Sequence, residues 1–445
     1  MEKLKELLWG TPTICVLLGT GIYLMILLKG LPIRKLPAAL RLSLGMGREA
    51  KDGEEKGISA FSCLATELAS TIGTGNILGV VGAMELGGPG ALFWMLLSAF
   101  TGLPTKLVET ALSVKYKSAS KEGEAVGGPM VTLAKAFPAK RLGKALGIFY
   151  AALAVAGSFC MGNLVQANSI ALSLRDAFGI EPKRLGFLLT FLTILAVLGG
   201  MKKISKIATF LVPAMGSLYL AGCLGILLCH LENLVPAIAQ IIRCAFHPRS
   251  ALGGLFGTAT CSFSACLRNG ISRGVFSNEA GLGAGGISAA FTKEKSYVRQ
   301  GLISMTGVFY DTILICTITG LACVVSGVAA QGPYAGGLMS AVFEGTYGSY
   351  GRVLLAICIT LFAFATILGW AVQGESAFAF LTGGRFREIY RLGYGFLALP
   401  GAMLASGFVW DLAEVINALM IFPNLLCVLA LAPGICAEIR NYELR

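Results

Sequence analysis

The sequence predicts an all-α membrane protein with eleven transmembrane helices, one at the N-terminus followed by a 5+5 inverted repeat. Three observations predict this fold. Of the 445 residues, 55% are hydrophobic and only 13% are charged, which is typical of integral membrane proteins. Apolar runs of about 20 residues, the length that a helix needs to cross a bilayer, recur along the whole chain. Glycines and hydroxyl residues interrupt the first run of each half, as is common in inverted-topology repeats.

The first apolar run, from Trp9 to Leu28, is longer than the core of a signal peptide and has no cleavage pattern, so we expect it to remain as a helix. The run at 251–290 is too long and too polar for one plain helix. The eleven expected spans are 9–29, 59–86, 90–114, 144–171, 185–200, 206–230, 251–290, 300–326, 351–381, 390–407 and 411–437.

The distribution of Lys and Arg predicts the orientation, because cytoplasmic loops collect basic residues. The basic residues of 30–57, 115–144, 202–206, 293–299 and 385–391 fall on one side, which we place in the cytoplasm, and far fewer fall on the other. The N-terminus is therefore expected outside and the C-terminus in the cytoplasm, in the cell membrane. This topology explains the net charge of +12 without a nucleic-acid partner.

An odd number of spans in each half makes the two halves enter the membrane from opposite sides. We therefore divide the chain into four parts. These are an N-terminal helix with a basic linker (1–57), a first five-helix repeat (58–230), an extracellular connector (231–250) and a second five-helix repeat (251–445). In inverted repeats the first and sixth core helices are discontinuous and meet near the bilayer midplane. The expected breaks are STIGTGN (Ser70–Asn76) and GGLFGTATCSFSAC (Gly253–Cys266).

A broken helix is tolerated in a membrane only where protein, water or a ligand satisfies the freed peptide groups. The N-terminus of the outer half-helix presents N–H groups that suit a carboxylate, and the free carbonyls of the inner half suit a cation. An amino acid with a small cation fits this pairing. Close helix packing through Gly75 and Gly79 is the alternative, although Gly73 and Gly75 lie about 200° apart round a helix and cannot share one face.

The motifs then resemble a known family. ELASTIGTGNILGVVGAMELGGPGALFWM (Glu67–Met95), GNLVQAN (Gly162–Asn168), RGVFSNEAGLG (Arg273–Gly283), FATILGW (Phe364–Trp370) and VWDLAEVINALMIFPN (Val409–Asn424) are similar to the alanine/glycine:cation symporter family. The resemblance covers the chain from about residue 57. It implies sodium-coupled, or in some members proton-coupled, uptake of alanine or glycine on a leucine-transporter-type inverted-repeat fold.

The resemblance also implies roles for individual residues. Carbonyls of Ala69 and Ile72, with the Ala363 carbonyl and the Thr366 hydroxyl, would hold a sodium ion; Thr71 and Asn76 would hold a second cation if two ions are coupled. Asn76 is equally well explained as a cap of the outer half-helix. The substrate-binding residues that we expect are Thr71, Gly73, Thr74, Gly75, Asn76, Gln166, Thr258, Ser262, Phe263, Thr366 and Trp370.

Structural alternatives remain open for several of these residues. Gln166 faces the site in the resemblance, but an ordinary helix-to-helix hydrogen bond also explains a polar residue at membrane depth. Phe263 and Trp370 either wall off a pocket for a small side chain or are packing residues.

Four charged residues are expected to act as gates or to tune the site: Glu67, Arg268, Arg273 and Glu279. Glu67 lies one turn before the first break, where it would tune the cation site, sense protons or pair with a base such as Arg268. Arg273 and Glu279 are expected at an inner gate, where ion pairs form and break.

These features together predict a secondary transporter, not an enzyme, and no cofactor is expected besides Na⁺ or H⁺ as the coupling ion. Its partners would be a small neutral amino acid, a monovalent cation and the lipid bilayer. The alternative is an ion channel with glycine-rich filter segments, which would normally need rings of ligands from several subunits.

Overall fold

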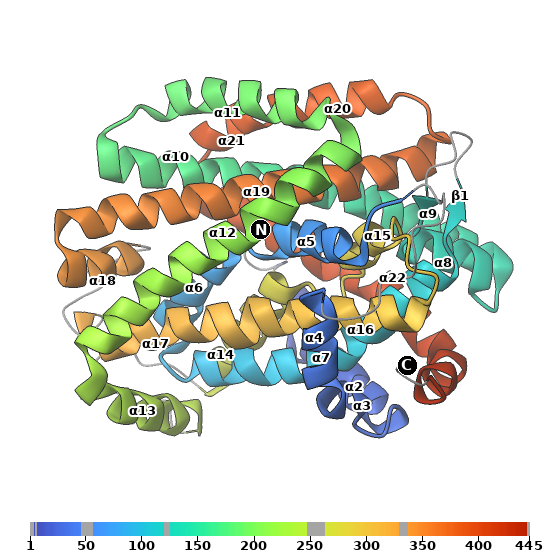
Figure 1. Cartoon of the computed structure of the whole chain (residues 1–445), viewed down its shortest axis with the longest axis horizontal. Coiled ribbons are helices and arrows are strands. Elements are labelled where there is room, and N and C mark those ends of the chain that lie inside the picture. The colour runs from blue at the N-terminus through green and yellow to red at the C-terminus, as the bar shows by residue number, and fades with distance from the viewer. Residues whose placement is uncertain are drawn as a thin grey trace.

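The computed structural model describes residues 4, 7–45, 57–119, 125–246, 263–328 and 337–442. These residues are almost entirely helical. The exception is a two-stranded hairpin in which β1 (Ser118–Ala119) pairs antiparallel with β2 (Ala125–Val126). The long helices run side by side across the molecule, with α13 and α18 at one end and β1 and α8 at the other (Figure 1).

The N-terminal half begins with a short apolar helix and continues through a helix that is broken in the middle. Its elements are α2 (Thr11–Leu27), α3 (Leu31–Arg34), α4 (Leu36–Ser43), α5 (Ala60–Thr71), η1 (Thr74–Asn76), α6 (Leu78–Gly87), α7 (Ala91–Lys115), α8 (Pro129–Ala136), α9 (Lys140–Gly157), η2 (Ser158–Leu164), α10 (Val165–Phe178), α11 (Pro182–Val197) and α12 (Gly200–Cys229). The π-helical turn η2 joins α9 and α10 into one long rod.

The C-terminal half also contains a broken helix, α14 and α15. Its elements are η3 (Leu231–Asn233), α13 (Leu234–Phe246), α14 (Phe263–Asn278), α15 (Ala284–Ala289), α16 (Tyr297–Val308), η5 (Phe309–Cys316), α17 (Thr317–Val325), α18 (Leu338–Tyr347), α19 (Ser349–Thr382), α20 (Arg387–Phe396), α21 (Ala398–Met403) and α22 (Ser406–Arg440). The π-helical η5 again lies inside a long rod, between α16 and α17.

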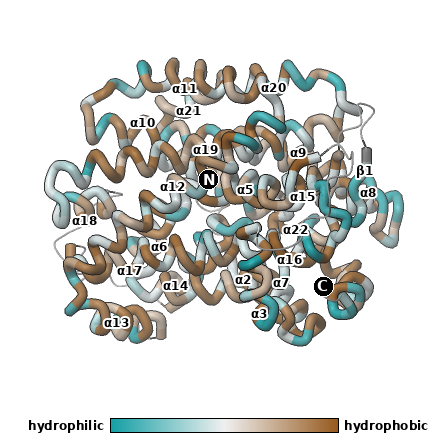
Figure 2. Tube along the Cα trace, in the orientation of Figure 1, coloured by the Kyte–Doolittle hydropathy of each residue, from teal (hydrophilic) through white to brown (hydrophobic). Residues whose placement is uncertain are grey.

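The long helices identify a multi-pass membrane protein. Among the described residues, six helices or joined helices are long and apolar enough to cross a membrane: 91–115, 140–178, 200–229, 297–325, 349–382 and 406–440; α2 is apolar but shorter. Hydrophobic residues dominate the length of these rods, and polar residues gather at their ends and in the connections (Figure 2). Large apolar side chains such as Phe210 (80% exposed) and Leu228 (69%) remain on the outer face of α12, where lipid would cover them.

The second break lies elsewhere than the sequence predicts. Residues 253–262 of the predicted segment, with Thr258 and Ser262, lie outside the described residues, and Phe263–Cys266 form the first turn of α14. The helix is interrupted instead at 279–283, within FSNEAGLG, where Glu279 (φ +55°), Gly281 (φ +93°) and Gly283 (φ +78°) adopt left-handed conformations. The prediction is therefore wrong for Phe263–Cys266, which has a single hydroxyl residue, Ser264, and no glycine, and is helical; for 253–262 it stays a prediction.

Candidate functional site

The first break occurs where the sequence predicts it. Helix α5 ends at Thr71, Ile72 leaves the helical region with ψ at 88°, and Gly73 is extended. The Gly73 N–H donates to Asn76 Oδ1 at 2.9 Å and the Thr74 N–H to Gln166 Oε1 at 3.4 Å. In a continuous helix these two donors would bind the carbonyls of Ala69 and Ser70, so those carbonyls lose their helical partners at the break.

Helix α19 lies directly against this break. Thr366 Oγ1 is 3.4 Å from the Ile72 carbonyl oxygen and 3.0 Å from that of Phe362, to which it donates. A Cβ at position 73 would collide with Thr366 Oγ1, so the close approach of α19 requires glycine there. The structure thus brings together Ile72 and Thr366 of the predicted sodium site. Ala69 and Ala363 are fully buried on the same two helices.

Gln166 reaches the break from α10. Its Oε1 accepts hydrogen bonds from the Thr74 hydroxyl at 3.0 Å and from the Thr74 N–H, and its Nε2 donates to the Met161 carbonyl of η2 at 3.0 Å. The interhelical hydrogen bond expected for Gln166 is therefore present, and its partner is the break itself; its role in substrate binding stays a prediction. Gly75 N–H, in contrast, donates no hydrogen bond to any described residue. A carboxylate that replaced the amide oxygen would meet N–H groups of Thr74 and Gly75.

Asp311 in η5 connects the two breaks and is not among the site residues predicted from the sequence. Asn76 Nδ2 donates to its Oδ1 at 2.6 Å, while the hydroxyls of Ser277 and Thr312 donate to its Oδ2 at 2.8 and 2.6 Å. Ser277 belongs to the last turn of α14, immediately before the second break. The signal was available, because an acidic residue within an otherwise apolar span indicates function by default.

The two predicted aromatic residues differ in position. Trp370 is buried, and its Nε1 donates to Glu279 Oε1 at 3.0 Å, so it lies beside the second break. Phe263 lies at the start of α14, is 46% exposed and packs edge-on against Trp94. The aromatic ring next to the first break is that of Phe276, whose Cδ1 would lie 3.4 Å from a Cβ at Gly75.

The charged residues pair differently from the expectation. Glu67 is paired with Lys106, with 3.0 Å between Nζ and Oε1, and not with Arg268. Arg273 forms an ion pair of 2.5 Å with Glu414 of α22 and lies over the Trp410 ring. Arg273 and Glu279 thus have separate partners, Glu414 of α22 and Trp370 of α19, and their role in a gate stays a prediction.

A hollow of about 740 Å³ opens on the α6 side of the first break. Leu78 in the first turn of α6 lines it, together with Arg273 and Trp410. Glu67 lies on the other side of the break, in α5, where the Glu67–Lys106 pair is buried. The hollow thus lies on one side of the first break and the buried ion pair on the other, while Thr74 and Asn76 at the break itself are fully buried.

The chain is similar throughout its length to known transporters. The model of the sodium:alanine symporter family matches residues 1–445. A sodium/alanine symporter of Methanococcus maripaludis is 39% identical over 446 residues, covering 100% of this chain and 96% of the relative. A probable sodium/glutamine symporter of Bacillus subtilis is 32% identical, covering 98% of this chain and 89% of the relative.

Solved structures show the same fold at low sequence identity. The structure of MhsT in complex with L-phenylalanine matches with a TM-score of 0.60 at 15% identity, covering 87% of this chain and 99% of that one. A Na⁺-coupled sialic acid symporter in a substrate-bound outward-open state matches with a TM-score of 0.59 at 13% identity, covering 96% and 87%. The described helices therefore adopt the leucine-transporter-type fold.

Proposed function

Because this chain belongs to the sodium:alanine symporter family, a family of transporters and not of enzymes, we propose that it takes up alanine or glycine together with sodium. Cation-coupled symport of amino acids follows from the family. The choice of small neutral substrates is our proposal, and the interrupted helix at 72–77, with Gln166 and Thr366 against it, is the observation that supports it.

The substrate carboxylate would take the place now occupied by the Gln166 amide oxygen. Thr74 offers an N–H and a hydroxyl there, and Gly75 offers an N–H that has no partner among the described residues. The N–H groups at the start of α6 add a partial positive charge. Phe276 and Trp370 then limit the room for the side chain of the substrate.

The sodium ion would be held by hard oxygen ligands at the end of α5. We assign the carbonyls of Ala69, Ile72 and Ala363 and the Thr366 hydroxyl to this site, because sodium favours oxygen ligands and these carbonyls lie where α5 ends against α19. Where two ions are coupled, the second would lie between the Thr71 carbonyl and Asn76, next to the Asp311 carboxylate.

Alternating access in an eleven-helix architecture completes the proposal. α2 would precede two five-helix repeats of opposite topology, with the N-terminus outside, the C-terminus in the cytoplasm and the protein in the cell membrane. One sodium ion crossing about 100 mV supplies about 2.3 kcal/mol. A tenfold concentration gradient adds about 1.4 kcal/mol, so one ion could concentrate a neutral amino acid several hundred-fold.

Transport in proteoliposomes tests the function. Purified protein is assayed by counterflow of labelled alanine, glycine and glutamine, each with and without sodium. We expect saturable exchange of alanine or glycine that requires sodium. Exchange of glutamine alone would contradict the proposed substrate, and ion currents without substrate would identify a channel instead.

A pair of threonine variants of α19 tests the sodium site. Thr366→Ala removes the hydroxyl next to Ile72 and should raise the half-saturating sodium concentration about tenfold or more, equivalent to about 1.4 kcal/mol. Thr360→Ala is the matched control, because Thr360 also donates to a carbonyl of its own helix, that of Ala356 at 2.7 Å, and the sodium site that we assign does not include it. Equal sodium dependence in the two variants would refute the assignment.

A further inference from the structure

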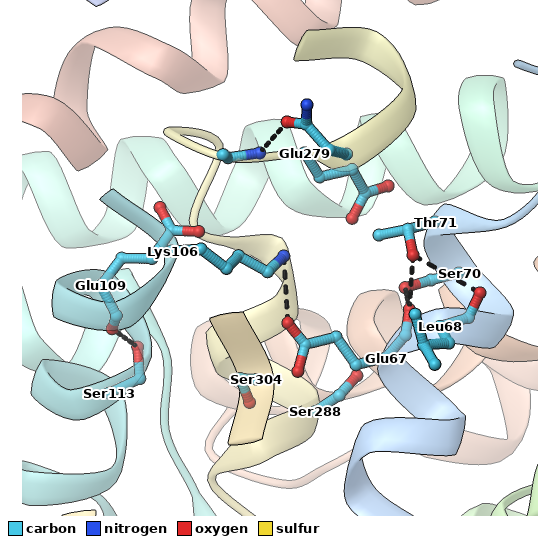
Figure 3. A network of polar contacts seen from close by, with 12 residues as sticks. Glu67, Leu68, Ser70, Thr71, Lys106, Glu109, Ser113, Glu279, Ser288 and Ser304 are labelled. Atoms are coloured by element: carbon cyan, nitrogen blue, oxygen red, sulfur yellow. Dashed lines mark hydrogen bonds and ion pairs between the residues drawn. The ribbon is translucent and has the colours of Figure 1, made fainter. Parts of the chain in front are cut away.

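A second polar cluster lies beside the two breaks, on the side opposite the hollow. It comprises Glu67 of α5, Lys106 and Glu109 of α7 and Glu279 of the second break (Figure 3). All four side chains are at most 2% exposed. We call these four residues the Lys106 cluster.

Each carboxyl of the Lys106 cluster has a different set of partners. Glu67 Oε1 is paired with Lys106 Nζ at 3.0 Å. Glu109 Oε2 accepts from the Gly281 N–H at 3.1 Å and from Asn424 Nδ2 at 2.9 Å. Glu279 Oε1 accepts only from the neutral indole N–H of Trp370 among the described residues. One oxygen of each carboxyl, Glu67 Oε2, Glu109 Oε1 and Glu279 Oε2, has no hydrogen-bond partner there, so Glu279 differs from the other two in having neither an ion pair nor a second donor.

The charges in this region do not balance. Three carboxyls face one ammonium group, so full ionisation would leave the cluster with a net charge of −2. The Glu109 carboxylate is stabilised by two N–H donors, whereas a Glu279 carboxylate would have one neutral donor. The other titratable groups that face it add no positive charge: Asp311 of η5 is acidic, and Tyr150 of α9 is neutral and donates to the Leu282 carbonyl at 2.7 Å. A buried charge without a partner is unfavourable, and an acid in that position binds a proton instead.

Packing leaves little room for a solvating ion or water at the ion pair. A Cβ at Gly285 of α15 would collide with both Glu67 Oε1 and Lys106 Nζ. Glycine at this position lets α15 pack against Lys106 while Lys106 is paired with Glu67, so the ammonium group is held at Glu67.

We propose that Glu279 is a proton-binding site, distinct from the sodium site at the first break. Its carboxyl carries the proton on Oε2, the oxygen without a partner, while Oε1 accepts from Trp370. When water reaches the second break, the Oε2–H bond breaks, its electron pair stays on the carboxylate and the proton passes to water. The ligand is a proton, and the step needs no other reactant.

Infrared difference spectroscopy of the purified protein tests this proposal directly. A protonated carboxyl in an apolar environment gives a C=O band that shifts in D₂O and disappears on titration to alkaline pH. We expect such a band in the wild-type protein at neutral pH and the loss of one carboxyl equivalent of its area in Glu279→Gln. Glu375→Gln is the matched control, because Glu375 forms an ion pair with Arg391 at 2.7 Å and should be ionised. This substitution should therefore leave the area of the C=O band unchanged.

Trp370→Phe supplies an independent measurement should Glu279→Gln fail to fold. It removes the one hydrogen bond that Glu279 Oε1 accepts from the described residues, so the C=O band should move to higher frequency. Absence of the band at neutral pH, its retention in Glu279→Gln, or an unchanged frequency in Trp370→Phe would each overturn the proposal. The infrared spectra are recorded without transport. Their outcome is therefore independent of the outcome of the sodium-dependent alanine uptake assay.

Discussion

The two helix breaks solve the same problem with different chemistry. At the first break, neutral amides accept the freed N–H groups: Asn76 Oδ1 binds Gly73 and Gln166 Oε1 binds Thr74. At the second, Glu109 Oε2 accepts from the Gly281 N–H and Asn278 Oδ1 from the Ala280 N–H. A neutral amide can exchange its place with a carboxylate ligand, whereas a buried carboxylate fixes charge. The second break thus differs in having an acidic side chain on one of its freed N–H groups, beside the neutral amide of Asn278.

The largest expected effect concerns the charge beside the second break. Lys106→Met leaves Glu67 without its partner in a buried position, and breaking a buried ion pair costs about 3–5 kcal/mol. We expect a corresponding loss of unfolding free energy in a thermal or denaturant assay. The double variant Lys106→Met/Glu67→Gln should recover much of it. Equal stability of the single and double variants would show that the pair contributes little.

The next effect concerns the close approach at the first break. Gly73→Ala places a methyl group against Thr366 Oγ1, and overpacking of this kind typically costs about 1–3 kcal/mol. Sodium-dependent uptake should be lost because α19 must move away from Ile72. Gly79→Ala is the control, since no described atom lies within 4 Å of a Cβ there. Similar uptake by both variants would contradict the role of this contact.

A smaller effect tests whether the Gln166 amide is exchangeable. Gln166→Leu removes the acceptor for Thr74, and an unsatisfied buried donor costs about 1–3 kcal/mol in the substrate-free protein. In the variant the substrate carboxylate would satisfy the Thr74 donors without displacing an amide oxygen. Alanine should therefore raise the melting temperature more in the variant than in the wild-type protein. A smaller rise would mean that Gln166 binds substrate directly and is not displaced by it.

The smallest effect is expected at the surface. Glu181 and Arg184 form an ion pair of 3.6 Å with side chains that are 59% and 81% exposed. Exposed pairs contribute about 0–1 kcal/mol because water and salt screen them, so Glu181→Gln should leave melting temperature and uptake nearly unchanged. A loss as large as that of Lys106→Met would contradict the distinction between buried and exposed charge.

Much of the fold was predictable because a membrane restricts what a chain can do. Every long helix in the described residues coincides with an expected apolar run, and the break at Gly73 was predicted from glycine and hydroxyl residues inside one such run. The break at 279–283 was not predicted, and the part of the predicted segment that the structure describes, Phe263–Cys266, is helical. Local composition permits a break, and packing against other helices selects the position.

Pairings between distant residues were the least predictable part of the site. A base such as Arg268 was expected as a partner of Glu67, whose partner is Lys106. Asp311 was not predicted, although it joins Asn76, 235 positions away in the sequence, to Ser277, 34 positions away. Charge and burial mark such residues as functional candidates. Sequence spacing alone gives no distance between them.

The sequence by itself determined that this chain crosses a membrane in many apolar helices, that one of them is broken at STIGTGN, and that it belongs among cation-coupled transporters. Hydrophobicity and glycine content are local properties of the sequence. In a bilayer they directly determine where helices span the membrane and where such a helix can break. Only the tertiary structure decided that FSNEAGLG forms the second break, and that Lys106 faces three carboxyls. Those arrangements depend on which helices pack together, which no local pattern encodes.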